Sequence, residues 1–284
     1  MKLNRADLGL GGGSLLQVAN RSLTQMMSYI IDTPDGNVIV IDGGHCCEVD
    51  ATYLYELLAE RGKKVDLWLM THAHVDHLGA LLWLFENCQN FDIVIEKMVY
   101  KFPPVEWLAE RKDDGCTARF LEAIKTWNIP TYTPQAGELL TCGGMSLEIV
   151  SVPEEYENYP TINATSIITV AHFPKRDVLF LADFDIHGQD EFLRKHDPES
   201  IRKDIVQMAH HGQGGVDFSF YKLIHPKICL YPTPQWLWEN NKYRCTVPAS
   251  AGTGPFTTLE TRQWMEELGV EQSLTHAEGD YVIT

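Results

Sequence analysis

The sequence lacks the long apolar segments of membrane and secreted proteins. None of its 284 residues falls in a stretch of about eighteen consecutive apolar residues, so no membrane-spanning helix is predicted. The N-terminal segment "MKLNRADLGLGGGSLLQVANRSL" also has no continuous apolar stretch of the kind that a secretory signal requires. The expected location is therefore cytoplasmic.

Basic residues are scarce in this chain. There are 23 Lys and Arg side chains against 39 Asp and Glu, which gives a formal net charge of −16. No run of Lys or Arg resembles a surface that follows a phosphate backbone. Tight binding to a long nucleic acid is disfavoured, although a bound metal cluster could supply positive charge locally.

Cysteine pairs and two common catalytic motifs are also missing. The seven cysteines are odd in number and show no C-x-x-C spacing, so the sequence supports neither a disulfide framework nor a zinc ribbon. We expect most of them to be small buried side chains. No G-x-S-x-G elbow or phosphate-binding P-loop occurs. Serine hydrolase and P-loop chemistry are thus not expected.

The residues that are present predict one globular domain. Apolar residues make up 44% and charged residues 22% of the chain, enough for a packed core. We expect a single domain over 1–284, with loop insertions near 153–164 and 232–256, where Pro, Asn and aromatic residues are frequent. The aromatic side chains of these loops either pack the loops onto the body, which is the commoner arrangement, or form an aromatic wall; they are Tyr156, Tyr159, Trp236, Trp238 and Tyr243.

Hydrophobic patterns predict an α/β scaffold. A hairpin over 26–33 and 37–44, joined by a Pro-Asp-Gly turn, precedes a helix over 49–62 and a buried strand over 65–70. Another strand is predicted over 91–100. The second half of the chain has a similar arrangement of predicted strands and helices, but its sequence is not a repeat of the first half. Its predicted elements are a hairpin over 165–173 and 175–184, helices over 188–196, 218–224 and 257–269, and strands over 204–212 and 227–231.

Ligand-type side chains follow the strand at 65–70, in the segment "THAHVDHLG" over 71–79. His72 and His74 project to the same side of an extended segment and can share one metal ion. Asp76 and His77 come after the turn and suit a second ion nearby. Because imidazole and carboxylate favour Zn, Mn or Fe over Ca or Mg, the segment predicts the start of a two-metal site.

Four motifs in order resemble the metallo-β-lactamase-fold hydrolase superfamily. "HAHVDH" matches the H-x-H-x-D-H signature, "VIVIDGG" resembles the strand that ends in the structural Asp42, "DVLFLADFD" resembles the strand that delivers the bridging Asp183, and "DIVQMAHHG" resembles the final histidine motif. The resemblance implies an αββα sandwich, four layers with the metals at one edge of two sheets.

One position departs from the pattern of the lactamases. They usually carry a histidine about twenty residues before the bridging aspartate, where this chain has Asn163. The motifs are closer to the hydrolase domain of bacterial competence (DNA-uptake) proteins and to the phosphorylcholine esterases. Lactam, glyoxalase and flavodiiron chemistry are therefore not expected, and His172, at a hairpin tip, is not an expected ligand.

The resemblance implies a full set of ligands and catalytic residues. One ion would be held by His72, His74 and Asp183, and the other by Asp76, His77, His211 and the same Asp183. For the pair at 210 and 211, adjacent residues diverge, so one of them binds metal; we prefer His211, and His210 as ligand stays open. The predicted catalytic residues are Asp76, His210 as a general acid, and Asp185, which would orient His210.

The expected function is hydrolysis of a phosphate ester, a phosphodiester or small phosphorylated molecule, by a metal-bound hydroxide. Two divalent ions would lower the pKa of the water, zinc being favoured with manganese or iron as alternatives. A nuclease is the second enzymatic hypothesis. The third is a metal-stabilised binding or sensing module without turnover, against which the intact ligand set argues.

Overall fold

Two β-sheets form the centre of the chain in the computed structural model, which describes residues 2–113, 115–243 and 250–284. The first has eight strands in the order β1-β17-β2-β3-β4-β6-β8-β9 and the second has seven in the order β10 to β16. The strands of the first sheet are, in that order, Leu3–Ala6, Asp280–Ile283, Ser14–Gln17, Tyr29–Asp32, Val38–Ile41, Leu67–Leu69, Met98–Val99 and Thr131–Tyr132. Those of the second are Leu139–Cys142, Met145–Ser151, Ile168–His172, Asp177–Phe180, Ile205–Gln207, Ile228–Tyr231 and Gln272–Thr275, and β5 (Lys64–Val65) pairs with β7 (Val94–Ile95) separately.

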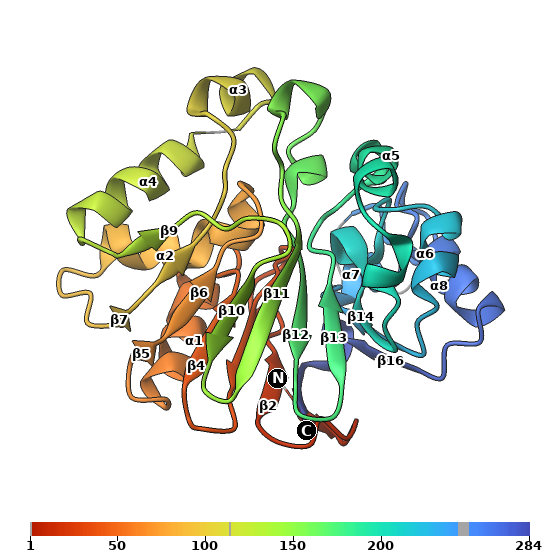
Figure 1. Ribbon diagram of the computed structural model, residues 1–284, viewed down its shortest axis with the longest axis horizontal. Helices are drawn as coiled ribbons and strands as arrows, with labels where there is room; N and C mark the ends of the chain where they lie inside the picture. The colour runs from red at the N-terminus through yellow and green to blue at the C-terminus, as the bar shows by residue number, and fades with distance from the viewer. Residues whose placement is uncertain (1, 114, 244–249) are drawn as a thin grey trace.

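Helices cover the outer face of each sheet (Figure 1). On one side lie α1 (Glu48–Ala59), α2 (Val75–Asn87) and α4 (Cys116–Thr126), with the short α3 (Val105–Glu110) above them. On the other side lie α5 (Ile186–Lys195), α6 (Phe218–Ile224), α7 (Gln235–Trp238) and α8 (Thr258–Glu267). Short 3₁₀ turns are η1 (Tyr156–Asn158), η2 (Asn163–Thr165), η3 (Pro198–Ile201), η4 (Ala209–Gly212) and η6 (His276–Glu278). This is the four-layer αββα sandwich that the resemblance implied.

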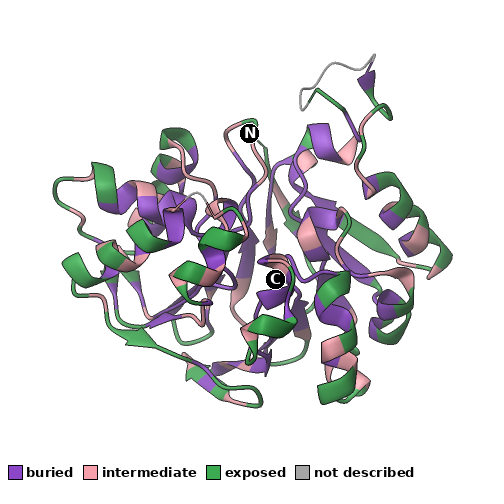
Figure 2. Cartoon of the chain, turned by 90° about the horizontal axis from the view of Figure 1, so that it is seen from above, coloured by how far each residue is buried: buried purple, intermediate pink, exposed green. Residues whose placement is uncertain are grey.

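Three apolar layers hold the sandwich together. In β4, Ile39 and Ile41 pack between the two sheets, whereas Val38 and Val40 pack under the helices, because successive side chains of a strand point to opposite faces. The second sheet divides its residues in the same way, with Val178 facing the first sheet. Figure 2 shows the result, with buried residues on the inner sides of the helices and exposed residues outside.

Most predicted elements are confirmed, with differences at the edges. The two predicted hairpins are β3–β4 and β12–β13, both antiparallel. The segment 91–100, which the sequence pattern indicates as one strand, divides into β7 and β8, because β7 pairs with β5 while β8 joins β6. The sequence prediction also missed six strands, which are β1, β2, β9, β10, β16 and β17.

The two predicted loop regions contain short helices. Segment 153–164 includes η1 and the start of η2, and segment 232–256 includes α7; residues 244–249, and with them Cys245, lie outside the described residues. Of the six described cysteines, only Cys116 and Cys229 are buried. The expectation that most cysteines are buried is therefore wrong for these six. Within the described residues, no helix has both the length and the apolar character to span a bilayer.

Candidate metal centre

The "THAHVDH" segment connects β6 to α2 and therefore lies at the carboxyl ends of the strands. His74 is the N-cap residue of α2, and Asp76 and His77 occupy its first turn. A carboxylate in the first turn of a helix is favourable because unpaired backbone N–H groups and the helix dipole meet it there. The helix start thus helps to place Asp76 and His77 beside the extended residues His72 and His74.

Asp42 fixes the orientation of His77. It follows β4 with a left-handed φ of 58° and is fully buried. Its carboxylate accepts hydrogen bonds from the backbone N–H and the hydroxyl of Thr71, at 2.8 and 2.7 Å, and lies 2.7 Å from Nδ1 of His77. Burial raises the pKa of Asp42, while the charge and hydrogen bond of His77 oppose that shift. This contact leaves Nε2 of His77 to face the centre.

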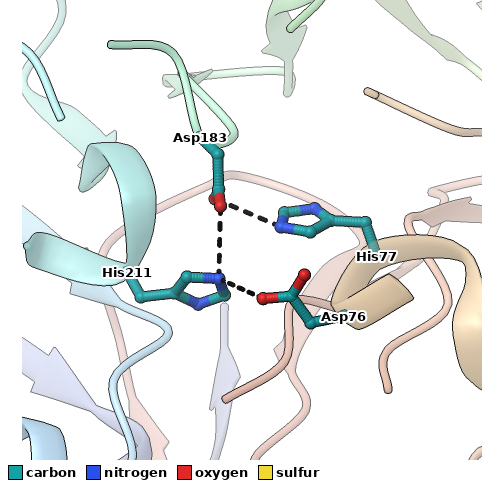
Figure 3. A group of neighbouring side chains, drawn as sticks. All are labelled: Asp76, His77, Asp183 and His211. Carbon is teal, nitrogen blue, oxygen red and sulfur yellow. Dashed lines mark hydrogen bonds and ion pairs between the residues drawn. The ribbon is translucent and has the colours of Figure 1, made fainter. Parts of the chain in front are cut away.

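Four buried side chains form the first ligand group, Asp76, His77, Asp183 and His211 (Figure 3). Nε2 of His77 lies 3.1 Å from Oδ1 of Asp183, and Nε2 of His211 lies 3.2 Å from Oδ2 of Asp76 and 3.5 Å from Oδ2 of Asp183. All four ligand atoms lie within 4.8 Å of one another. The group supplies two imidazoles and two carboxylates, a donor set suited to a divalent transition metal.

A second ligand group shares Asp183 with the first and consists of His72, His74 and Asp183. Nε2 of His72 lies 3.1 Å from Nδ1 of His74 and 3.9 Å from Oδ2 of Asp183. The two groups therefore meet at one carboxylate. This arrangement is compatible with two metal ions bridged by Asp183.

Orphaned polar atoms show that these side chains fit a cation. Nε2 of His77 and Oδ1 of Asp183 are buried and form an ion-pair contact at 3.1 Å, but neither atom has a hydrogen-bond partner of good geometry among the described residues. Buried polar atoms in folded proteins usually have a partner, and a divalent ion between these two atoms would satisfy both. Although burial alone would raise the pKa of Asp76, its hydrogen bond to His211 holds that pKa well below the usual range. Both observations favour ionised carboxylates that accept a cation.

Residues around the ligands were not predicted from the sequence. Gln25 donates a hydrogen bond of 3.1 Å to Oδ2 of Asp76, and Gln213 donates one of 2.9 Å to Gln25. The carbonyl oxygen of Pro232 accepts from Nδ1 of His211 at 2.9 Å. Such contacts orient metal ligands, but isolated glutamines and a backbone carbonyl carry no sequence signal that could have revealed them.

The two adjacent histidines diverge as the sequence analysis expected. His210 and His211 both have left-handed backbone conformations, with φ of 48° and 54°. His211 is buried in the first ligand group, whereas the His210 side chain is 26% exposed, with Nε2 3.9 Å from Oδ2 of Asp183. Nε2 of His210 also lies 3.3 Å from Nδ2 of Asn163. His210 therefore stands at the edge of the centre.

Asp185 does not contact His210 in the described part of the chain. Its carboxylate caps α5 by accepting from the N–H groups of His187 and Gly188, at 2.9 and 3.3 Å. It also accepts a hydrogen bond of 2.6 Å from the hydroxyl of Thr161. The structure thus brings six predicted ligands and His210 together, but it joins His210 to Asn163 and not to Asp185.

His172 lies away from the metal centre. His172 is at the opposite end of β12, between Glu148 and Asp177 at 2.9 and 2.8 Å, consistent with the expectation that it is not a ligand.

The aromatic residues of the two predicted loops do not form one wall. Trp238 packs against Tyr231 and under the guanidinium of Arg262, Trp236 packs against Phe256, and Tyr156 packs against Trp107. Tyr243 is 67% exposed. Among the described residues, Trp238 and Tyr156 pack their loops onto the body, Trp236 packs within its own loop, and Tyr243 is exposed.

Comparisons with known proteins agree with this geometry. The sequence profile described as "Metallo-beta-lactamase superfamily" matches residues 23–212. ComE operon protein 3 of Bacillus subtilis (strain 168) is 21% identical over 188 residues, which cover 66% of this chain and 22% of that much longer protein.

Solved structures share the fold at low identity. The metallo-beta-lactamase fold protein YhfI from Bacillus subtilis is 13% identical, with a TM-score of 0.55 over 95% of this chain and 99% of that chain. CmlA, a diiron beta-hydroxylase from Streptomyces venezuelae, is also 13% identical, with a TM-score of 0.57 over 95% of this chain and 54% of that chain. At these identities the likeness shows the fold alone.

Proposed function

This chain belongs to the metallo-beta-lactamase superfamily, whose members are mostly hydrolases, and we propose that it is a dinuclear metal-dependent hydrolase that cleaves a phosphate ester. The observation that carries the proposal is the sharing of Asp183 between two ligand groups. His72, His74 and Asp183 would hold one ion, and Asp76, His77, His211 and Asp183 the other. When bound, two divalent ions supply an activated water and neutralise negative charge that develops on the substrate.

The donor count supports a phosphate ester as the substrate. The group of His72, His74 and Asp183 offers three ligands, and Asn163 stands near this part of the centre in place of the histidine that lactamases carry. A metal with few protein ligands keeps positions open for water and for substrate oxygens. Two ions side by side can hold both the attacking and the leaving oxygen of a phosphoryl group.

His210 is the proposed proton donor to the leaving oxygen. It lies at the edge of the centre, is partly exposed, and approaches Oδ2 of Asp183 to 3.9 Å without joining either ligand group. Nδ2 of Asn163 donates to Nε2 of its ring and would hold the ring in place, so the transferable proton would sit on Nδ1, which has no hydrogen-bond partner among the described residues. In this proposal Asn163 takes the orienting role that the sequence analysis gave to Asp185.

Nucleic acid is a weaker candidate as substrate because of where the basic residues lie. A surface hollow is lined by Lys175, Arg176, Arg202 and Lys203, near the amino ends of β13 and β14. The metal ligands follow the carboxyl ends of these strands. A nuclease would need its basic residues beside the centre, and its binding would weaken steeply with salt.

The test is turnover of bis(p-nitrophenyl) phosphate by protein loaded with zinc, manganese or iron, with the metal content measured by mass spectrometry. His74→Ala removes a ligand, and His187→Ala is the matched control because His187 is exposed on α5. We expect turnover in the wild type and in His187→Ala, and its loss in His74→Ala. Absence of turnover in fully loaded wild-type protein on this and a wider panel of phosphate esters would contradict the proposal.

A further inference from the structure

A second hollow lies between α5 and the segment that ends β11 and leads to β12. We call it the α5 hollow; its volume is about 270 Å³, and its walls include Val152, Tyr159, Ser166, Phe184, Phe192 and Lys195. None of the residues that line it belongs to the two ligand groups. It is therefore a separate site on the outer side of the second sheet.

The interior of the α5 hollow is apolar and aromatic. Phe184 and Phe192 are buried, with ring centroids 6.1 Å apart, and the ring of His196 stacks on Phe192 at 4.8 Å with an angle of 26°. Tyr159 is also buried and lines the same space. Aromatic walls of this kind favour a flat apolar ligand.

Polar groups line the hollow at two levels. Ser166 is 2% exposed, and its hydroxyl has no hydrogen-bond partner among the described residues. Nearer to solvent, Nζ of Lys195 lies 3.3 Å from Glu154 and 2.9 Å from Glu191. A buried hydroxyl without a partner is uncommon in folded proteins and indicates a missing polar contact.

These groups define the chemistry of the ligand. Glu154, Glu191 and Lys195 give the entrance no excess of positive charge. Electrostatic attraction therefore contributes little to the binding of a phosphate or another anion there. The carboxylates can accept from amino groups, and Lys195 can donate to a ring nitrogen. Pockets for drug-sized ligands span roughly 300–1,000 Å³, so this volume suits a single ring system.

We infer that the α5 hollow binds a neutral, planar heteroaromatic molecule of nucleobase size, at a site distinct from the metal centre. Its walls are connected to that centre through short contacts. Thr161, between the lining residues Tyr159 and Ala164, donates to Asp185, and Asn163 contacts His210. Phe184 lies between Asp183 and Asp185 in the sequence. A bound ligand would therefore alter turnover. This effect on turnover rests on the proposed function, but the binding of the ligand does not depend on it.

The test is a calorimetric titration with adenine, carried out on metal-loaded and on chelator-treated protein. Ser166→Ala removes the unpartnered hydroxyl, and Ala136→Phe narrows the entrance from an exposed position, with Ala118→Phe on the exposed face of α4 as the matched control. We expect the wild-type chain to bind adenine saturably. Ser166→Ala should weaken this binding by about tenfold because one hydrogen bond is lost, and Ala118→Phe should leave it unchanged.

The inference is overturned if adenine does not saturate the wild-type chain, or if folded Ser166→Ala and Ala136→Phe bind it as tightly as wild type. Tighter binding of adenosine monophosphate than of adenine would overturn the expected neutrality. Because calorimetry on chelator-treated protein needs no turnover, these outcomes are independent of whether the metal centre hydrolyses phosphate esters.

Discussion

Asp42 and His77 lie 35 positions apart in the sequence and are joined by a hydrogen bond of 2.7 Å. Both side chains are inaccessible to solvent. The contact ties the end of β4 to the first turn of α2. It also assigns Nδ1 of His77 to Asp42, which leaves Nε2 for Asp183 and a metal. One carboxylate outside both ligand groups thus determines how a ligand of the centre is presented.

Replacement of this carboxylate should weaken metal binding. In Asp42→Asn the amide oxygen can still accept one hydrogen bond, but the negative charge beside His77 is lost. We expect about a 10- to 100-fold loss of zinc affinity, the usual effect of removing a group that orients a metal ligand, measured by competition with a chromogenic chelator. Asp66→Asn, a change at a carboxylate outside the ligand groups, is the control. Equal affinities in all three proteins would contradict the role of Asp42.

Removal of the Asn163 side chain should mainly lower kcat, whereas removal of the Asp185 side chain should mainly lower the free energy of unfolding. Asn163→Ala removes the contact to His210 and should lower kcat by about 10²-fold, the lower range for a proton donor, without loss of metal. Asp185→Ala removes the cap of α5 and should cost about 1 kcal/mol in the free energy of unfolding, with a smaller effect on kcat. Steady-state kinetics, metal analysis and urea denaturation distinguish the two. The reverse pattern would return the orienting role to Asp185.

Metal loading should release protons at neutral pH. Burial opposes protonation of His211, but the carboxylates of Asp183 and Asp76 raise its pKa to about 10 in the metal-free chain. An imidazole must lose its extra proton before it can bind a metal, so the ion displaces this proton and apparent affinity should rise with pH up to that value. Calorimetric zinc titrations in buffers of different ionisation enthalpy measure the release, and a heat independent of the buffer would contradict it.

The same group sets an opposite trend for the metal-free chain. The pKa of His211 in the folded chain lies above its unfolded value of about 6.5. Protonated His211 therefore contributes its full stabilisation of the folded state below about pH 6.5. This stabilisation is lost as pH rises toward 10. Thermal denaturation of chelator-treated protein should therefore show a falling Tm over this interval, and His211→Gln should flatten the trend.

Gly79 should not tolerate a side chain. A Cβ at this position in α2 would meet the backbone N and Cα of Cys46, which lies in the loop after β4. Alanine gains about 1 kcal/mol in helix propensity, but overlap with backbone forces the helix and the loop apart and typically costs about 1–3 kcal/mol or more. Gly79→Ala should lower the free energy of unfolding, and Asn87→Ala, at an exposed position of the same helix, should change it little.

The residues of the two candidate ligand groups could be recognised in the sequence because they lie in short local patterns. His72, His74, Asp76 and His77 occupy one short segment, and Asp183 and His211 each follow a strongly apolar strand. Such patterns appear in the sequence without knowledge of long-range contacts. Asn163 was noticed as a departure from a family pattern, but its contact to His210 depends on η2 and on the left-handed backbone of His210.

Other parts of the fold depend on pairing across long distances. The strands β1, β16 and β17 are short and carry polar residues, so their hydrophobic pattern is weak. They become strands because partners far away in the sequence offer backbone hydrogen bonds, as when Leu3 pairs with Asp280. The prediction that Asp185 orients His210 found no such contact for a different reason, because the carboxylate of Asp185 caps the adjacent helix α5.

The position of β17 has a consequence for the order in which the chain can fold. This strand lies between β1 and β2, so segments from the two ends of the chain alternate in one sheet. The ends lie close together in Figure 1. During synthesis the first residues leave the ribosome long before residues 280–283 exist. The edge of β2 therefore stays without its neighbour until translation reaches this strand, and a chaperone that shields exposed strand edges would act during that interval.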